Sequence, residues 1–517
     1  MLTRRLTSSS AYHGQRIAIV GAGPAGFYAA TRLLSLYGQQ TNIKIDMFEL
    51  LPTPFGLARF GVAPDHPEVK NCQHKFEETA QDERVRFFGN VQIGSDIVPN
   101  LERSQHAVQI DIETLRQHYD ATLLTYGASL DRQLNIPGET TLSNVLSART
   151  FVNWYNGHPY HSSLLSPLID LKQLKHVTVV GQGNVALDVA RILLKPTNEL
   201  TQFDVPEPVL EQLTSSRVER VDIVGRRGPL QLACTTKEVR EMMNLANVGF
   251  ETDNTLLQQA IDWVSNYPTM QGHRAKKRLI GLLQQGSKSN INNSQKSWSF
   301  QFLKSPIELL SNEQGQAPTP VDMLTSPLDS VGQIKWDLNE FVVPRESSTT
   351  TTTIQDIVAN DPNLLQVKPT GQQTITSTDL VLKSVGYRSI GLPGLPFDDK
   401  RGIISNNQGR VVNEQGQMIP GLYTCGWLAR GPTGVIATTM FDSFSTADLI
   451  HQDLLSNLNQ QIIKPELNLK EITKNKQIVN WKDWQRIDQE EKRRGQIKNK
   501  LREKMTDVGD MLKFLSS

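Results

Sequence analysis

Cysteine is scarce in this chain: Cys72, Cys234 and Cys425 are the three among 517 residues, and they lie far apart. They form no C-x-x-C pair and no zinc spacing. A disulfide scaffold, a thiolate zinc site and a protein-ligated iron–sulfur cluster are therefore excluded. A redox-active cysteine pair is also missing, which disfavours a disulfide reductase.

Long apolar runs and an excess of one charge are missing as well. No run of 18 apolar residues occurs, so no transmembrane helix is predicted. Lys plus Arg total 54 and Asp plus Glu total 53, which argues against bulk nucleic-acid binding. With 38% hydrophobic and 21% charged residues, the composition is that of a globular protein. The length predicts two or three domains.

Acidic residues are absent from the N-terminal segment, since the first one is Asp46. The segment contains Arg4, Arg5 and three consecutive serines at 8–10, without an apolar core. Basic, serine-rich and acid-free starts are typical of mitochondrial transit peptides. We therefore expect residues 1–13 to be a transit segment, which predicts location in the mitochondrial matrix. A short disordered start is the alternative.

Two stretches of the chain show the pattern strand, glycine turn, helix, strand. The first has strands at 16–20 and 43–48 around a helix at 25–36; the second has strands at 176–180 and 218–224 around a helix at 184–194. Short apolar runs that alternate with helical sequence indicate βαβ units and a parallel sheet. Two copies, about 160 residues apart, predict an α/β fold with two Rossmann-like dinucleotide-binding domains.

The first glycine turn is a G-x-G-x-x-G motif formed by Gly21, Gly23 and Gly26. Its glycines permit a tight turn, close approach of a pyrophosphate and close packing of helix on strand. Glu49 ends the next strand, 28 residues after Gly21, where a carboxylate accepts hydrogen bonds from ribose hydroxyls. Because a carboxylate repels a 2′-phosphate, this site favours FAD or NAD. The alternative is a structural glycine turn beside a surface glutamate.

The second glycine turn is a G-x-G-x-x-A motif with Gly181, Gly183 and Ala186. Its partner strand ends at Arg226 and Arg227 instead of at a carboxylate. Guanidinium groups pair with phosphate through two parallel hydrogen bonds, so the two arginines predict an NADP site. A solvated arginine pair is the alternative. Two sites of opposite charge imply bound FAD and exchangeable NADPH, with hydride passing between them.

Composition changes in three further stretches. Gly286–Ser299 is rich in Ser, Asn, Gln and Lys, and Ser347–Thr353 is Ser-Ser followed by five Thr. Both are expected to be surface insertions or mobile loops. Residues 461–517 hold 14 basic and 9 acidic residues, a net charge of +5, and are expected to form a solvated helical tail anchored by Trp481 and Trp484.

Two longer motifs carry a family resemblance. They are PFGLARFGVAPDHPEVKN at 54–71 and GWLARGPTGVIATT at 426–439. Together with GQGNVALDVAR and VGRRGP, they resemble the mitochondrial NADPH–adrenodoxin (ferredoxin) reductase family, and the resemblance covers most of the chain. It implies a two-domain flavoenzyme of the glutathione-reductase type, with the NADP domain inserted into the FAD domain.

The resemblance also implies boundaries and cofactor contacts. The FAD domain is expected at 14–116 and 373–460, the NADP domain at 117–372 and the tail at 461–517. FAD is expected to contact Gly21, Gly23, Ala25, Gly26, Glu49, Leu57, Val91, Trp427, Gly434, Val435 and Ile436. NADPH is expected to contact Gly181, Gly183, Asn184, Val185, Ala186, Arg226, Arg227, Glu238 and also Gly434. For Trp427 the alternative is a core aromatic.

Two residues are hypotheses for a catalytic role. His66 is expected to orient the flavin or relay a proton near it, and Asp188 to help with the proton balance. The alternatives are a structural histidine and a capping or helix-surface carboxylate. Hydride transfer itself needs no general base, and no metal site is expected.

The resemblance implies a [2Fe–2S] ferredoxin, an acidic protein, as the acceptor of single electrons. An acidic partner requires a basic surface. We expect it at Lys237, Arg240, Arg274, Lys276, Lys277 and Arg278, although a solvated helix face is the alternative, and Asn244 stands where the family tends to carry a further basic residue. Downstream, the electrons would serve P450-type hydroxylation, haem A or iron–sulfur cluster synthesis. Peripheral contact of the tail with the inner membrane is a further possibility.

Other functions stay open at this point. An NADPH-dependent flavoenzyme with a small-molecule acceptor, either a diaphorase or a monooxygenase, has the same two sites. A protein with degenerate sites is disfavoured by the intact glycines, Glu49 and the arginine pair.

Overall fold

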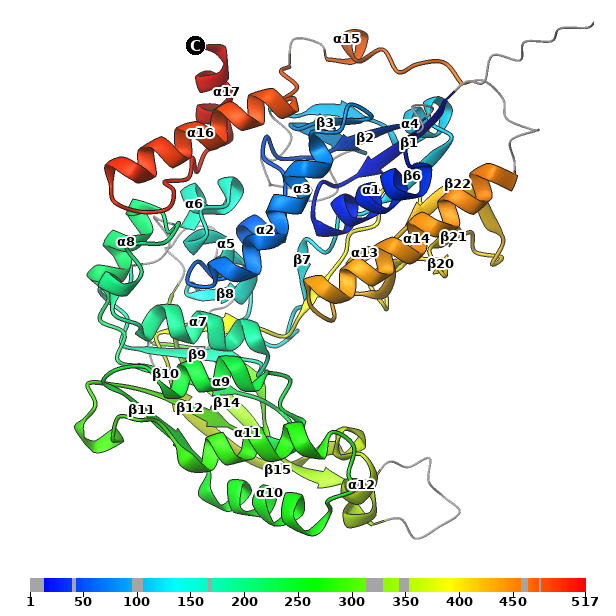
Figure 1. Cartoon of the computed structure of the whole chain (residues 1–517). Helices are drawn as coiled ribbons and strands as arrows, with labels where there is room; N and C mark the ends of the chain where they lie inside the picture. Colours follow the sequence, from blue (N-terminus) through cyan, green and yellow to red (C-terminus); the bar gives the residue numbers. More distant parts are fainter. Residues whose placement is uncertain are drawn as a thin grey trace, which may run out of the picture.

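The structure, a computed structural model, describes residues 14–39, 43–94, 106–165, 170–312, 329–343, 353–456, 464–473 and 476–517. The predicted transit segment 1–13 and residues 347–352 of the threonine-rich stretch lie outside the described residues. Figure 1 shows two domains, each with its own sheet, and a C-terminal tail that lies against both.

The first domain is built around a seven-stranded sheet, which combines strands from residues 15–124 with strands from residues 406–424. Its order is β20 (Asn406–Asn407), β21 (Arg410–Val412), β22 (Met418–Thr424), β6 (Ala121–Leu124), β1 (Gln15–Val20), β2 (Ile43–Phe48) and β3 (Val85–Phe88). Strands β1 and β2 are parallel and pair from Gln15 with Ile43 to Val20 with Phe48. Helices α1 (Pro24–Tyr37) and α14 (Ile436–Ser456) pack side by side on this sheet (Figure 1).

The second domain is built around a six-stranded sheet in which every described pairing is parallel. Its order is β11 (Val248–Thr252), β12 (Lys296–Gln301), β10 (Arg220–Val224), β9 (His176–Val180), β16 (Leu380–Lys383) and β8 (Val145–Ser147). Strand β9 is buried after its first residue because both faces of a parallel sheet are covered. The covering helices include α5 (Ala148–Tyr155), α7 (Asn184–Leu194) and α9 (Thr236–Met243). The two predicted βαβ units are thereby confirmed, each within two residues.

The remaining elements connect or extend these layers. The first domain adds α2 (Leu57–Phe60), η1 (Pro67–Asn71), α3 (Cys72–Ala80), β4 (Val91–Ile93), β5 (Val108–Ile110), α4 (Ile112–His118), β18 (Phe397–Asp398), β19 (Ile403–Ile404) and α13 (Trp427–Arg430). The second domain adds α6 (Pro159–Leu165), η3 (Thr197–Glu199), α8 (Glu207–Thr214), η4 (Pro229–Gln231), α10 (Asn254–Asn266), α11 (His273–Gln285), η5 (Ile291–Asn293), β13 (Lys304–Ser311), β14 (Val331–Val342), α12 (Ile354–Asn360), η7 (Pro362–Leu364) and β15 (Gln366–Ser377). The tail holds α15 (Leu469–Ile472), α16 (Trp481–Ile497) and α17 (Val508–Ser516).

The chain crosses between the domains later than the predicted boundaries near 116 and 373. Strand β6, at 121–124, pairs with β1 in the first sheet, and β16, at 380–383, pairs with β9 in the second. The two crossings run side by side where β7 (Leu130–Asp131) pairs with β17 (Tyr387–Arg388). Both boundaries were therefore placed too early, because a short apolar strand does not show which sheet it joins.

The prediction of a surface insertion at Gly286–Ser299 is wrong for its last part. Residues from Lys296 onward form β12, which lies between β10 and β11, and Trp298 on this strand is fully buried. Polar residues flank the tryptophan on the strand, so composition hid a central strand. In the threonine-rich stretch, Thr353 is described as the N-cap of α12.

The tail is helical, as predicted, but it is only partly solvated, since one side of it is buried. Trp484 and Ile487 of α16 and Met511 of α17 are buried in the core of the first domain. Glu491 and Lys504 are buried as well, because oppositely charged groups lie against them. Among the described helices, none combines the length and the hydropathy that crossing a bilayer would require.

Candidate functional site

The turn after β1 opens onto a cavity of about 350 Å³ at the carboxyl end of the first sheet. Gly21 has φ +107°, and a Cβ there would meet the Thr125 carbonyl at 2.8 Å. A Cβ on Gly26 would lie 2.3 Å from the Gly21 oxygen, whereas a Cβ on Gly23 meets no atom within 4 Å. Gly23 lines the cavity and is the N-cap of α1. Open space at a helix N-terminus fits an anionic pyrophosphate.

Glu49 is fixed at one end of the cavity by the backbone. Its carboxylate accepts hydrogen bonds from the N–H groups of Ala22 at 2.9 Å and Leu51 at 3.1 Å. Burial raises the pKa of Glu49, and these N–H groups oppose the rise. Leu50 and Val91 line the cavity beside it. This end therefore suits a ribose and an adenine ring.

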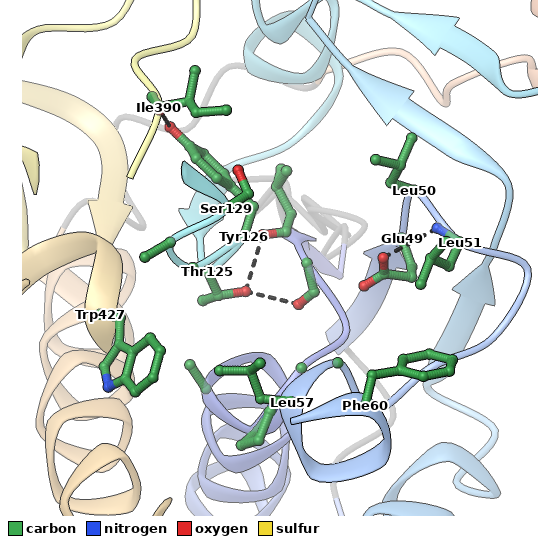
Figure 2. Close-up of a pocket in the computed structure, with 18 of the residues that line it drawn as sticks. Glu49, Leu50, Leu51, Leu57, Phe60, Thr125, Tyr126, Ser129, Ile390 and Trp427 are labelled. Carbon is green, nitrogen blue, oxygen red and sulfur yellow. Dashed lines mark hydrogen bonds between the residues drawn. The ribbon is translucent and has the colours of Figure 1, made fainter. Parts of the chain in front are cut away.

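Trp427 lines the opposite end of the cavity, with Val435, Ile436 and Thr439. Figure 2 shows Glu49 and Trp427 on opposite sides of the space, with Leu57 between them. The Trp427 ring lies 5.8 Å from that of Tyr387, tilted by 32°. The core-aromatic alternative for Trp427 is thus only partly right, since the ring packs on Tyr387 but also faces the cavity. A flat ring system fits this end.

The turn before α14 is held by Arg430. Its guanidinium group contacts the Asp442 carboxylate and the Thr433 carbonyl, and it donates to Thr439 Oγ1 at 3.1 Å. Gly434 follows with φ +78°, a left-handed conformation that glycine adopts without strain. Of the predicted FAD contacts, Gly26 and Gly434 do not line the cavity, while the other nine do. Gly26 allows close packing, and Gly434 shapes the turn that presents Val435 and Ile436.

Sequence reasoning missed a set of lining residues from the domain connections and from the second domain. Thr125 Oγ1 donates to the carbonyls of Val20 at 3.0 Å and Gly21 at 2.8 Å, so it locks the glycine turn. Tyr126 donates to the Ile390 carbonyl at 2.9 Å, and burial raises its pKa. Further lining residues are Phe60, Arg149, Asn153, His158, Tyr160, His161 and Leu392. Phe60 stands in the 54–71 motif but was not singled out there, and the other residues stand in none of the motifs that the sequence showed.

The second glycine turn repeats the geometry of the first. Gly181 has φ +121°, and a Cβ there would lie 2.2 Å from the Ser384 oxygen. Gly183 is the N-cap of α7 and has open space at its Cβ position. Asn184 Oδ1 accepts the Thr235 N–H at 2.8 Å, which ties α7 to the segment before α9. A second helix N-terminus with an open glycine turn therefore exists, with Val185 and Ala186 in its first turn, and its geometry fits a phosphate.

Arg226 and Arg227 follow the end of β10, directly beside the turn after β9. Both are exposed, and in the described part of the chain neither guanidinium group forms an ion pair. Two uncompensated cations at this place fit a 2′-phosphate. Glu238 lies on α9, where Thr235 donates to its carboxylate, and burial raises its pKa.

His66 and Asp188 belong to one charged cluster at the junction of the two domains. His66 Nε2 lies 2.7 Å from Glu241 Oε2, and Arg191 lies 2.9 Å from Asp188 and 3.5 Å from Glu241. Arg191 also forms two hydrogen bonds with Asp65, at 2.9 and 3.0 Å. Burial raises the pKa of Asp188, opposed by Arg191 and His66. Glu241 was missed, although it follows Glu238 by three residues on α9.

The helix-surface alternative for Asp188 is wrong, since its side chain is 18% exposed and paired with Arg191. His66 is also largely buried, at 8% exposed. Their functional roles stay predictions.

Five of the six predicted basic residues are exposed, and Lys276 is partly buried. Arg240, Arg274, Lys277 and Arg278 are exposed on α9 and α11, two helices that pack against each other. Lys276 instead donates to the Leu230 carbonyl at 2.6 Å, and burial lowers its pKa. Lys237 lies 2.9 Å from Glu68 of the first domain. Lys276 and Lys237 therefore contact other parts of the protein as well as contributing charge.

All three cysteines are free thiols, and none of them lines the cavity. Burial raises the pKa of Cys234 and of Cys425 to about 12, which keeps these thiols protonated. A disulfide reductase remains disfavoured.

Comparison with known proteins agrees with this geometry. Residues 15–252 match the family model described as pyridine nucleotide-disulphide oxidoreductase. The mitochondrial NADPH:adrenodoxin oxidoreductase of Salvelinus fontinalis is 37% identical over 98% of this chain and 92% of its own length. The corresponding protein of Drosophila melanogaster is 40% identical over 96% of this chain and 93% of its own length. The solved structure of Mycobacterium tuberculosis FprA in complex with NADPH has a TM-score of 0.80 and 34% identity, covering 98% of this chain and all of that one. The chain therefore belongs to the NADPH:adrenodoxin oxidoreductase family.

Proposed function

We propose that this protein is a mitochondrial NADPH:ferredoxin oxidoreductase that binds FAD in the first domain and NADPH in the second. One observation carries the proposal. Two helix N-termini with open glycine turns occur in one chain, and the neighbouring side chains are acidic at one site and doubly basic at the other. When bound, FAD accepts a hydride from NADPH and releases electrons singly, as a [2Fe–2S] acceptor requires.

The side chains of this protein have separate tasks in that reaction. Glu49 accepts ribose hydroxyl donors, while the helix start after Gly23 holds the pyrophosphate. Arg226 and Arg227 select the 2′-phosphate over an unphosphorylated ribose. Trp427, Val435 and Ile436 line the end of the cavity at which the reacting ring would lie. His66, Glu241 and Asp188 can hold or move a proton at the domain junction.

The acceptor we propose is an acidic ferredoxin of the adrenodoxin type. Exposed Arg240, Arg274, Lys277 and Arg278 support a cationic docking surface on α9 and α11. Names of the relatives support a mitochondrial location. Location in the matrix and electron supply to hydroxylation, haem A or cluster synthesis are proposals that rest on the family. Membrane contact of the tail is weakly supported, because much of its charge pairs within the protein.

The test is NADPH-driven reduction of cytochrome c by the purified FAD-containing protein, with and without an acidic [2Fe–2S] ferredoxin. We expect activity that depends on the ferredoxin and falls as ionic strength rises. Charge reversal by Arg240→Glu with Arg278→Glu is expected to raise the ferredoxin KM, whereas Lys400→Glu, at an exposed site of the first domain, is the matched control. Dye reduction that ignores the ferredoxin would instead indicate a small-molecule acceptor.

A further inference from the structure

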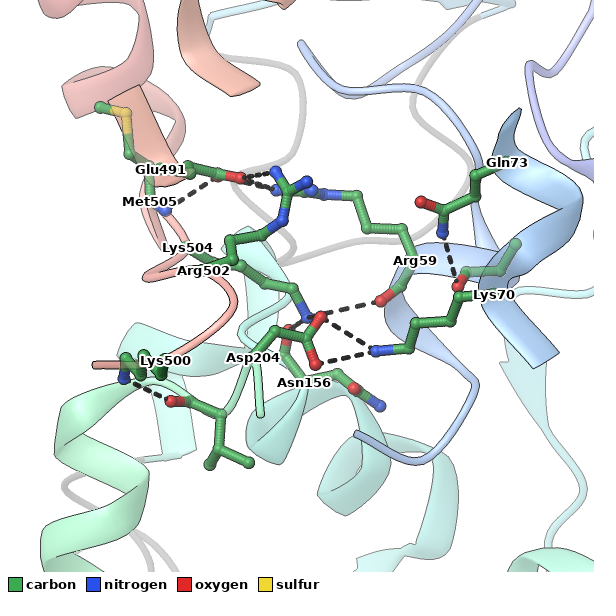
Figure 3. Close-up of polar contacts among 12 residues, drawn as sticks. Arg59, Lys70, Gln73, Asn156, Asp204, Glu491, Lys500, Arg502, Lys504 and Met505 are labelled. Atoms are coloured by element: carbon green, nitrogen blue, oxygen red, sulfur yellow. Dashed lines mark hydrogen bonds and ion pairs between the residues drawn. The ribbon is translucent and has the colours of Figure 1, made fainter. Parts of the chain in front are cut away.

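A buried ammonium group of the tail lies where the two domains meet. Lys504, in the connection between α16 and α17, is 3% exposed. Its Nζ lies 2.8 Å from Asp204 Oδ2 and donates to the carbonyls of Asn156 at 2.9 Å and Arg59 at 3.5 Å. Figure 3 shows Lys504 at the centre of these groups. One side chain of the tail therefore touches both domains.

The carboxylate of Asp204, in the second domain, is shared between two lysines. Lys70 of η1, in the first domain, lies 2.9 Å from each of its oxygens, and Lys504 approaches from the tail. The two ammonium groups hold the pKa of Asp204 well below its usual range. A buried charge that loses its partner is costly, so this three-membered contact resists separation of the domains.

The tail segment from Trp484 to Met511 packs into the first domain at both of its ends. Glu491 of α16 accepts two hydrogen bonds from Arg59, both at 2.7 Å, and lies 2.8 Å from Arg502. It also accepts the Met505 N–H at 3.0 Å. Trp484 at one end of this segment and Met511 at the other are in the first core. The chain thus leaves the first domain, contacts the second and returns, which limits how far the second domain can move.

The contact lies one side chain away from the cofactor cavity. Phe60 of α2 lines the cavity, and Lys504 Nζ is 5.8 Å from the centre of its ring. His158, two residues after Asn156, lines the same wall from the second domain, with its ring 4.9 Å from that of Phe60. A shift of Lys504 would therefore move the wall of the cavity at which the domains meet.

We propose that Lys504 is a positioning residue for hydride transfer, which fixes the second domain against α2 and so sets the distance between the two dinucleotide sites. The proposal rests on the NADPH-to-FAD half of the proposed function and needs no ferredoxin. Hydride transfer depends steeply on geometry, and a misplacement of about 1 Å can cost up to roughly a hundredfold in rate. The glycine turn and the strand-end side chains of each site lie within one domain, so the affinity for each nucleotide alone should change less than the rate of transfer between them.

The test compares Lys504→Met with the wild-type holoenzyme by stopped-flow absorbance of the flavin under anaerobic conditions. We expect the limiting rate of flavin reduction at saturating NADPH to fall about ten- to hundredfold. FAD content and the Kd for NADP⁺ are expected to change less than about threefold. Hydrogen exchange, measured without NADPH, is expected to rise at residues 57–60 and 156–161. Lys513→Met, at an exposed lysine of α17, is the matched control.

An unchanged limiting rate in Lys504→Met would overturn the proposal, even if the protein became less heat-stable. So would parallel losses of FAD and NADP⁺ affinity, because these indicate general damage. If Lys504→Met does not retain FAD, Lys70→Met removes the other ammonium from Asp204 and must lower the limiting rate in the same way. Failure of the ferredoxin assay alone would affect the proposed acceptor and leave this result intact.

Discussion

The two glycine turns of this protein share a backbone and differ in the side chains at the end of the second strand. In both, a glycine with positive φ packs against a neighbouring strand end, and a second glycine opens a helix N-terminus to empty space. Glu49 then lines the cavity and accepts two backbone N–H groups, whereas Arg226 and Arg227 lie exposed at the surface. On the proposed assignment, the backbone binds phosphate at both sites and the side chains choose the nucleotide.

The largest effect is expected when the arginine pair is removed. Arg226→Ala with Arg227→Ala should raise the KM for NADPH and leave that for NADH nearly unchanged. Each lost contact to phosphate costs about 1.5–3 kcal/mol, so the NADPH preference should fall at least a hundredfold. Steady-state kinetics with both nucleotides measures it. Equal losses for NADPH and NADH would contradict the 2′-phosphate assignment.

A smaller effect is expected from a matched pair of glycine substitutions. Gly23→Ala and Gly183→Ala each place a methyl group in space that the protein leaves open, so both variants should fold. Gly23→Ala should lose FAD. Gly183→Ala should keep its FAD and its yellow colour but bind NADP⁺ weakly. Crowding of this kind costs about 1–3 kcal/mol, or roughly five- to 150-fold in affinity.

Flavin content and NADP⁺ titration measure the two effects separately. Gly26→Ala is the control for packing, because its methyl group would meet the Gly21 oxygen at 2.3 Å and should destabilise the first domain itself. Loss of both nucleotides from one glycine variant would show that the two sites are not independent.

A still smaller effect is expected at the acidic end of the cavity. Glu49→Gln keeps the shape of the side chain, but it removes the charge and replaces one of the two accepting oxygens with an NH₂ donor, so FAD affinity should fall by about 1 kcal/mol or more, at least roughly fivefold. NADP⁺ affinity should not change. Fluorescence of released FAD in a dilution series measures the FAD affinity. A change in NADP⁺ affinity would indicate that the two sites are not independent.

The smallest expected effect is a pH dependence of FAD retention. Burial raises the folded pKa of Glu49 above its ordinary value of 4.5. As pH falls through this raised pKa toward 4.5, the carboxylate takes up a proton in the folded protein and loses its charge as an acceptor. FAD release should therefore increase a few-fold in this window, although the cofactor-free fold gains stability there. Glu49→Gln should show no such increase, and NADP⁺ binding through the arginines should not follow this titration.

Sequence patterns predicted the parts of the site that depend on local geometry. Gly21, Gly23 and Glu49 needed a strand, a turn and a helix in series, and each of these forms from neighbouring residues. Arg149, His158 and Phe60 share the cavity wall although they come from different domains, and no local pattern links them. The same difference explains the tail: its charge predicted solvent exposure, whereas Glu491 and Lys504 are buried by partners hundreds of residues away.

The sequence determined the fold class, the two dinucleotide sites and their opposite charges, because glycine spacing and strand-end residues act within one βαβ unit of about 30 residues. Tertiary structure alone decided where the chain crosses between the sheets, which residues close the cavity and how the tail holds the domains together. Those features depend on pairing between distant segments, where burial of a charge or a ring is favourable only once its partner is in place.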